Sequence, residues 1–264
     1  MDSVAVDGLE IAYERAGTGP PLVLLHGGFG DSRDWRRQLD DLSDEFTVVA
    51  WDAPGCGQSA DPPDTFRASH YGDCLARFIA ALALGRPHVL GLSAGSVIAL
   101  ELYGGHRGVP VSLILASAYA GWAGSLPSEE VDRRLAQVLR ETELPPEQFV
   151  PGWIPTLLTP AAPNDLIDEV TEIMSDFHPL GTRILINAFG DADYRPVLPT
   201  ITVPTLLLYG DADSRSPLHV AKDLHDQIAG STLVMLPNVG HASNVEAPAA
   251  FNTAVRTFLH TIVA

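Results

Sequence analysis

The sequence predicts an α/β fold, in which a mostly parallel central sheet carries helices on both of its faces. Short apolar runs of strand length alternate along the chain with helical segments. Most of these runs are apolar at every position, which is typical of strands that are covered on both sides. The chain has 264 residues, of which 46% are hydrophobic and 19% are charged, and this is the composition of a globular protein with a sizeable core.

The apolar runs locate the strands. Residues 9–15 alternate between apolar and polar side chains, so we expect a half-exposed strand that ends at the turn residues 17–21. Leu22-Val23-Leu24-Leu25 is the first continuous apolar run and predicts a buried strand. Further runs of this kind predict strands over 46–51, 88–92, 111–116, 203–209 and 232–236.

Helices are predicted where apolar residues recur at every third or fourth position. Tyr71, Leu75, Phe78, Ile79 and Leu82 have this spacing. Similar segments predict helices over 32–42, from residue 96 onward, over 218–228 and over 249–262.

The stretch 119–199 breaks the alternation of strands and helices. It contains two helical segments, near 129–141 and 166–177, and proline-rich turns between them. The regular pattern then returns at residue 203. We therefore expect one core formed by residues 1–118 and 200–264, with residues 119–199 inserted as a helical segment above the sheet.

The stretch Gly91-Leu92-Ser93-Ala94-Gly95 lies between a predicted strand and a predicted helix. A serine with glycine two residues to either side, at such a junction, matches the nucleophile elbow of hydrolases. The serine occupies a tight, strained turn that exposes its hydroxyl, and side chains at the two glycine positions would collide with the neighbouring strand and helix. The start of the helix also places a backbone N–H beside the hydroxyl, where it can stabilise an oxyanion.

Functional groups in an open α/β sheet gather at the carboxyl ends of the strands. Five predicted strands are followed by polar or glycine-rich residues: His26-Gly27-Gly28-Phe29, Asp52, Ser93, Gly210-Asp211-Ala212-Asp213 and Gly240-His241. A hydroxyl, a carboxylate and an imidazole therefore converge on one edge. A serine needs an adjacent base to become a nucleophile, and the base needs a group that fixes its tautomer. The chain order of serine, acid and histidine is the order expected for this architecture.

These motifs together resemble the α/β-hydrolase superfamily. The segment Asp52–Ser59 and the tail from His241 to Pro248 are similar to its capped esterase and lactonase-type members. The resemblance covers nearly the whole chain and implies an α/β-hydrolase fold with a cap at 119–199. It also implies that Ser93 is the nucleophile, that His241 is the general base and then the general acid, and that Asp213 orients His241.

The resemblance implies an oxyanion hole formed by the backbone N–H of Ala94 and that of Gly28 or Phe29, and the sequence does not choose between the last two. Asp211 competes with Asp213 for the role of the acid, but the family's spacing from Gly210 favours Asp213. Asp211 then caps the turn. His26 is expected to hold the oxyanion loop rather than to take part in the reaction.

The aromatic residues of 119–199 are expected to form the core of that segment and in part to cover the cleft. Phe29 and Trp122 adjoin the cleft most directly and are the candidate substrate contacts. An apolar roof over a polar triad favours an uncharged, partly apolar substrate.

The composition argues against several partners and cofactors. The formal net charge of −17 argues against nucleic acid and anionic membranes, because both require a basic surface. The two cysteines, Cys56 and Cys74, form no metal-binding motif, the histidines have no metal-ligand spacing, and no dinucleotide or phosphate loop occurs, so neither metal nor cofactor is implied. The N-terminus resembles no signal peptide and no long apolar run occurs, so a soluble, cytoplasmic protein is expected. The sequence leaves the oligomeric state open.

The sequence thus predicts a serine hydrolase that cleaves a small, largely apolar carboxylic ester through an acyl-enzyme intermediate. A lactone or enol-lactone hydrolase, a carbon–carbon bond hydrolase and a cofactor-free perhydrolase use the same triad and stay open as alternatives. Outside enzymes, a ligand receptor that retains a triad and a non-catalytic interaction domain stay open as alternatives. Related dehalogenases and epoxide hydrolases have aspartate at the position of Ser93, which argues against their chemistry.

Overall fold

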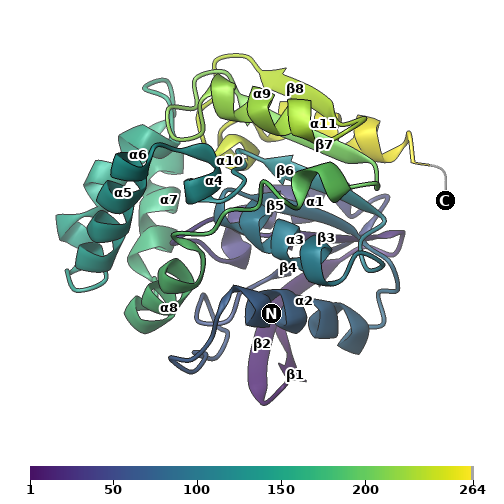
Figure 1. Ribbon diagram of the computed structural model, residues 1–264, viewed down its shortest axis with the longest axis horizontal. Helices are drawn as coiled ribbons and strands as arrows, with labels where there is room; N and C mark the ends of the chain where they lie inside the picture. Colours follow the sequence, from purple (N-terminus) through teal and green to yellow (C-terminus); the bar gives the residue numbers. More distant parts are fainter. Residues whose placement is uncertain (263–264) are drawn as a thin grey trace.

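An eight-stranded sheet forms the centre of the protein in a computed structural model that describes residues 1–262 (Figure 1). Its strands are β1 (Asp2–Val6), β2 (Leu9–Ala16), β3 (Pro21–Leu25), β4 (Thr47–Trp51), β5 (His88–Leu92), β6 (Ser112–Ala116), β7 (Thr205–Gly210) and β8 (Thr232–Leu236). They lie in the order β1-β2-β4-β3-β5-β6-β7-β8. β2 is antiparallel to both β1 and β4, and every other pair is parallel. The predicted mostly parallel α/β sheet is confirmed.

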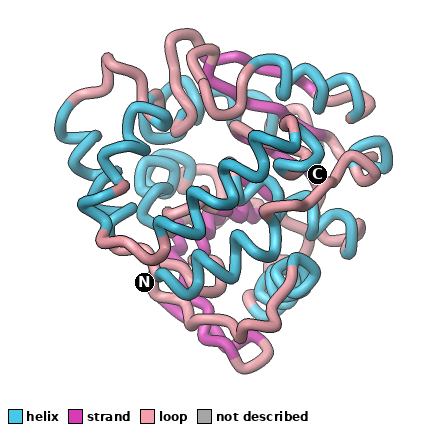
Figure 2. Tube along the Cα trace, turned by 60° about the vertical axis from the view of Figure 1, so that its left-hand side comes forward, coloured by secondary structure: helices cyan, strands magenta, loops and turns pink. Residues whose placement is uncertain are grey.

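Helices cover both faces of the sheet, as Figure 2 shows for the strands in magenta and the helices in cyan. One core lies between the sheet and α2 (Ala68–Ala81), α3 (Ala94–Gly105) and α9 (Leu218–Gln227). The opposite core lies beneath α1 (Arg36–Leu42) and α11 (Pro248–Leu259). Val23 of β3 enters the first core and Leu24 the second, since successive side chains of a strand point to opposite faces. This explains why the central strands are apolar at every position.

The strand order brings distant parts of the chain together at one edge of the sheet. β5 lies between β3 and β6, so that Leu25 pairs with Gly91 and Leu92 pairs with Ala116. β7 and β8 follow on the far side of β6. Because β3 and β5 to β8 are parallel, the loops after all of them open at the same edge. The functional groups predicted from the sequence lie on these loops.

Residues 119–199 contain helices and no strand in the described chain. These helices are α4 (Trp122–Ser125), α5 (Ser128–Glu141), α6 (Val150–Leu157), α7 (Asn164–Ser175) and α8 (Pro179–Phe189), with 3₁₀ turns at Pro146–Gln148 and Leu198–Thr200. α5 and α7 were predicted, whereas α4, α6 and α8 were not. α6 contains Pro151 in its first turn and Pro155 near its end, which had indicated turns. Figure 1 shows α5 to α8 grouped at one side of the sheet.

Other differences from the predicted elements are local. The strand β1 had no sequence signal because it is short and mostly exposed at the edge of the sheet. The helix expected over 32–42 begins as a 3₁₀ turn, Ser32–Trp35, and continues as α1. The Asp31 carboxylate caps that turn by accepting a hydrogen bond from the Arg33 N–H. The short helix α10 (Ser243–Glu246) after β8 was also not predicted.

Candidate active site

Ser93 lies at the turn between β5 and α3 in a strained backbone conformation, with φ +52° and ψ −112°. Its own N–H donates to the Ala116 carbonyl of the neighbouring strand at 2.9 Å. A Cβ at Gly91 would lie 2.3 Å from the Gly95 carbonyl oxygen, and a Cβ at Gly95 would lie 2.1 Å from the Leu25 carbonyl oxygen. Both neighbours are backbone atoms that cannot turn aside. The steric reason predicted for the two glycines is therefore present in the structure.

Replacement of Gly95 by alanine is expected to lower the free energy of unfolding by about 3 kcal/mol, because its Cβ would overlap the backbone of β3. Gly105→Ala, at the other end of α3, is the matched control, since nothing lies within 4 Å of its Cβ position. The control is expected to raise stability by about 0.5 kcal/mol. Urea denaturation measures both changes, and equal stabilities of the two variants would contradict the packing described for the turn.

His241 and Asp213 form a buried pair at the carboxyl ends of β8 and β7. The His241 Nδ1 lies 2.8 Å from one carboxylate oxygen of Asp213 and 3.0 Å from the other. The residues are 3% and 5% exposed. Because a carboxylate can only accept, Nδ1 carries the hydrogen, and in the neutral imidazole Nε2 therefore has the lone pair. The pair thus has the tautomer that a general base requires.

The Asp213 carboxylate is stabilised in its charged form. Burial raises the pKa of Asp213, but the attraction of His241 and the hydrogen bonds to the carboxylate outweigh it, and the pKa lies below its ordinary value. Two of these hydrogen bonds come from the backbone N–H groups of Arg215 and Ser216, each at 2.9 Å. Asp213 is therefore ionised and held in place by its own turn.

Asp211 has a different environment. Its carboxylate is exposed and accepts a hydrogen bond from the Asn238 N–H at 2.6 Å. The structure therefore brings Asp213 to His241 and leaves Asp211 as a cap of the turn.

Two serines that sequence reasoning missed hold this pair. The Ser117 hydroxyl, at the end of β6, donates to the His241 carbonyl at 2.8 Å. The Ser216 hydroxyl donates to the Ala118 carbonyl at 2.8 Å. In the sequence, Ser117 is recognisable only as a serine that follows a predicted strand, and Ser216 only as a serine shortly after Asp213. Serines at such positions are too common for the sequence to identify these two.

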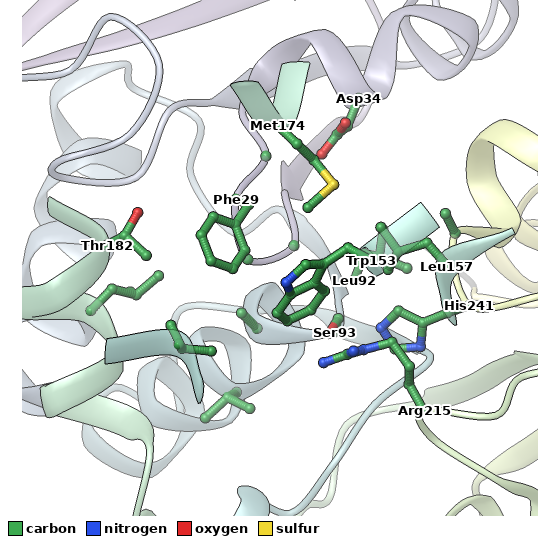
Figure 3. A pocket seen from close by; sticks show the side chains of 18 of the residues that line it. Phe29, Asp34, Leu92, Ser93, Trp153, Leu157, Met174, Thr182, Arg215 and His241 are labelled. Atoms are coloured by element: carbon green, nitrogen blue, oxygen red, sulfur yellow. The ribbon is translucent and has the colours of Figure 1, made fainter. Parts of the chain in front are cut away.

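Ser93 and His241 line the same cavity, and Figure 3 shows both side chains at its base. In the described residues no hydrogen bond joins the Ser93 Oγ to the imidazole, and the hydroxyl has no other partner. Such bonds are often long in ligand-free enzymes and shorten when substrate binds. The structure thus joins Asp213 to His241 directly and places Ser93 in the lining of the same cavity as His241.

The loop after β3 lies against Ser93. A Cβ on Gly27 would come within 3.8 Å of the Ser93 Cβ. Phe29 has a positive φ of 60°, which is unusual for a residue with a side chain. No hydrogen bond of the described chain uses the N–H groups of Gly28, Phe29 or Ala94. These three donors are available to an oxyanion.

His26 holds this loop, as expected from the sequence. Its Nε2 accepts a hydrogen bond from the Ala53 N–H at 3.0 Å, so the hydrogen is on Nδ1, which donates to the Gly27 carbonyl at 2.8 Å. Both ring nitrogens are thereby occupied, and the side chain has a structural role.

The cavity has a volume of about 130 Å³ and an apolar lining. A cavity of about 150 Å³ can hold benzene, so this one admits a small organic group. Phe29 lines it and packs against three aromatic rings of the 119–199 segment, Phe149, Trp153 and Phe177, at centroid distances of 5.1–5.5 Å. Trp122 lines it as well. The two candidate substrate contacts both face the cavity.

Asp34 and Arg215, which sequence reasoning did not identify, are the charged residues of the described chain that line the cavity besides His241. The Asp34 carboxyl has no hydrogen-bond partner in the described residues. Burial raises the pKa of Asp34 to about 8, and the nearby Asp31 carboxylate adds to the rise. Figure 3 shows Asp34 beside Met174, while Arg215 lies beside His241.

The raised pKa of Asp34 predicts a change of stability with pH. The folded protein keeps a proton that the unfolded chain loses, so stability falls as pH rises from about 4 to about 8. Asp34→Asn is expected to remove this loss of stability. Near pH 8.5 its free energy of unfolding is expected to exceed that of the wild type by about 2 kcal/mol, a value reduced because the cavity is accessible to solvent.

Urea denaturation near pH 5 and near pH 8.5 measures the effect of Asp34→Asn. Asp226→Asn, at an exposed position of α9, is the matched control. A stability difference between Asp34→Asn and the wild type that stays constant with pH would contradict the environment described for Asp34.

Residues 1–262 contain no group of three or more histidine, cysteine or acidic side chains arranged to hold a metal ion. Among the helices of the same residues, none combines the length and the apolar character needed to cross a membrane.

Comparison with known proteins identifies relatives over the whole chain. The sequence profile described as the alpha/beta hydrolase family matches residues 22–254. A putative carbamate hydrolase RutD of Caulobacter sp. (strain K31) is 33% identical, with 98% of each chain covered. A pimeloyl-[acyl-carrier protein] methyl ester esterase of Vibrio parahaemolyticus is 28% identical, over 93% of this chain and 96% of the relative. The solved structure of an esterase from Thermogutta terrifontis superimposes with a TM-score of 0.90 at 27% identity, over 99% of this chain and 97% of that one.

Proposed function

Because the chain belongs to the alpha/beta hydrolase family, we propose that it is a serine hydrolase that cleaves a small carboxylic ester. The observation that carries the proposal is the buried Asp213–His241 pair, whose free imidazole nitrogen faces the cavity that Ser93 lines. Relatives of the chain include esterases, which favours an ester over other substrates.

In the first half of the proposed reaction, the Ser93 hydroxyl attacks the ester carbonyl and His241 Nε2 takes its proton. The tetrahedral intermediate collapses when His241 returns that proton to the alcohol, which leaves as the acyl-enzyme forms. In the second half, His241 removes a proton from water, the hydroxide attacks the acyl carbonyl, and Ser93 regains its hydrogen. Asp213 stays ionised throughout and stabilises the imidazolium that forms in each half.

The negative oxygen of each tetrahedral intermediate is proposed to bind the N–H of Ala94 together with that of Gly28 or Phe29. Among residues 1–262 these N–H groups have no other partner. Ala94 follows Ser93 directly, and Gly28 and Phe29 follow Gly27, whose Cβ position is 3.8 Å from the Ser93 Cβ. Ala94 is the first residue of α3, where the helix dipole adds to the attraction. Preorganised donors of this kind are worth about 3 kcal/mol each in related chemistry.

We propose that residues 119–199 form a cap over this site. Trp153, Val170 and Leu185 come from three of its helices and line the same cavity as Ser93. An apolar roof of this kind favours a substrate whose body is largely apolar, and the volume of about 130 Å³ favours a short one.

A panel of p-nitrophenyl esters from acetate to octanoate tests this proposal, with lactones and a carbamate of similar size included. The wild type is expected to prefer short esters, with kcat/KM falling once the acyl chain exceeds the cavity. If the protein hydrolysed the carbamate faster than every ester, its substrate class would be carbamates and not esters. Turnover of none of these compounds would refute the proposal.

A further inference from the structure

Arg215 is a cation in the cavity without an anion to match it. Its side chain lies beside His241 in Figure 3, and both residues line the cavity with Ser93. The N–H groups of the Arg215 guanidinium have one protein acceptor among the described residues, the Thr156 hydroxyl at 3.2 Å. No carboxylate of residues 1–262 lies within 4.0 Å of the guanidinium. Most of its donors are thus left without a protein partner.

The contacts of Arg215 fix its position without neutralising it. The guanidinium stacks on the Trp153 indole, with its central carbon 4.1 Å from the ring centroid. The indole N–H donates to the buried Glu141 carboxylate at 2.9 Å, and the Asp213 carboxylate is held by His241, so neither acid forms an ion pair with the guanidinium in the described residues. Burial lowers the pKa of Arg215, although an arginine stays charged in a protein.

Arg215 is half-buried, and a charge that is partly removed from water without a counterion is unfavourable and is rarely retained for stability alone. The neighbouring Arg134 illustrates the usual solution, since its guanidinium forms an ion pair with Glu130 at 2.6 Å. Glu130 also pairs with Arg133. The hollow beside the site is lined by three arginines and one acidic residue, Glu130, in a chain whose net charge is −17. The nearby acids Glu141 and Asp213 are bound to the Trp153 indole N–H and to His241. This hollow is therefore more favourable for an anion than most of the acidic surface.

We propose that Arg215 binds a carboxylate carried by the substrate, so that the preferred substrate is a short ester or lactone with a free carboxylate a few bonds from the scissile carbonyl. This inference rests on the proposed function and names its substrate class. It revises the uncharged substrate expected from the sequence, because the guanidinium of Arg215, which forms no ion pair in the described residues, lies against Trp153 of the apolar roof.

The chemistry of the guanidinium favours a carboxylate over a neutral polar group. Its planar fork matches the two oxygens of a carboxylate and forms two parallel charge-assisted hydrogen bonds. The indole of Trp153 holds that plane, so little side-chain entropy is lost when the anion binds. The remainder of the cavity is small and mostly apolar, with Asp34 and His241 as its other ionisable residues. Its size limits the spacer between carboxylate and ester to a few carbons.

Two pairs of isosteric esters test the proposal. Monomethyl succinate and methyl levulinate differ only in a carboxylate against an acetyl group on the acyl side. Acetoxyacetate and acetoxyacetone differ in the same way on the alcohol side. The quantity measured is the ratio of kcat/KM for the charged ester to that for its neutral partner, by titration of the released acid. Comparison of this ratio between variants cancels the intrinsic reactivities of the esters.

For at least one pair, Arg215→Gln is expected to lower this ratio by about 10- to 100-fold, the range of a hydrogen-bonded ion pair. Arg215→Lys keeps the positive charge but loses the planar guanidinium that can donate two parallel hydrogen bonds. It is expected to give an intermediate ratio. Arg107→Gln is the matched control for the loss of one positive charge. Arg107 is exposed just beyond the far end of α3, about 18 Å along the helix from Ser93, and its replacement leaves the ratio unchanged.

A ratio that Arg215→Gln does not change in either pair would overturn the anion site. If the Arg215→Gln variant does not fold, inhibition of the wild-type enzyme by a charged and a neutral compound tests the anion site instead. Succinamate, which is charged, is expected to inhibit the hydrolysis of methyl levulinate at least about tenfold more tightly than neutral succinamide. Equal inhibition would overturn the anion site. A wild type that cleaves none of the four esters would instead refute the proposed function, so the two failures are distinct.

Discussion

Replacement of Ser93 by alanine is expected to lower kcat for p-nitrophenyl butyrate by about 10⁴- to 10⁶-fold, the range for loss of a triad nucleophile. The alanine variant keeps His241, Asp213 and the free N–H donors, so it retains binding but cannot form the acyl-enzyme. Alanine at a positive φ of 52° is no more strained than serine, and the variant is expected to fold with nearly wild-type stability. Steady-state hydrolysis and urea denaturation measure the two properties separately.

Ser3→Ala, on the exposed edge strand β1, is the control for loss of a hydroxyl far from the site. It is expected to keep wild-type activity. Residual activity of Ser93→Ala above about a hundredth of the wild type would remove Ser93 from the proposed reaction, since water and binding alone do not supply that rate.

Replacement of Asp213 by asparagine is expected to lower kcat by about 10³- to 10⁴-fold, the effect of placing the imidazole in the wrong tautomer. The asparagine NH₂ can donate to Nδ1, in which case the hydrogen moves to Nε2 and the base is lost. Asparagine has the size and shape of aspartate, so the turn that supplies the Arg215 and Ser216 N–H groups can stay in place. The initial rate of ester hydrolysis measures the effect.

Asp211→Asn is the matched control, because its carboxylate lies two residues away and accepts only from Asn238 in the described chain. It is expected to keep kcat within about twofold of the wild type, as for a surface substitution away from the site. The reverse result, with Asp211→Asn inactive and Asp213→Asn active, would move the acid's role to Asp211.

Residues that the backbone itself constrains could be predicted from the sequence. The glycines around Ser93 are required by atoms of β3 and α3 that lie within 2.3 Å of their Cβ positions, so their spacing is a reliable signal. The parallel strands β3 and β5 to β8 were predicted from continuous apolar runs, because both faces of the sheet are buried. Their order along the chain then placed Ser93, Asp213 and His241 at one edge.

Residues whose role depends on tertiary packing could not be predicted in this way. Arg215 follows Asp213 by two positions and resembles any exposed arginine of a turn until Trp153 is packed on its guanidinium. Asp34 lies on a short 3₁₀ turn, and only the 119–199 segment encloses its carboxyl. The helix α6 escaped prediction because a sequence pattern assigns its two prolines to loops, although Pro151 lies in the first turn, where proline is tolerated, and Pro155 lies inside the helix.

The central claim is that the hydroxyl of Ser93 is activated by His241 within this site. Labelling of the native protein with a fluorophosphonate, followed by mass spectrometry of the peptides, tests it most directly. We expect one equivalent of label on Ser93, none on the Ser93→Ala variant, and labelling at least about 100-fold slower in Asp213→Asn. A protein that stays unlabelled, or that carries the label on another serine such as Ser96, would contradict the claim.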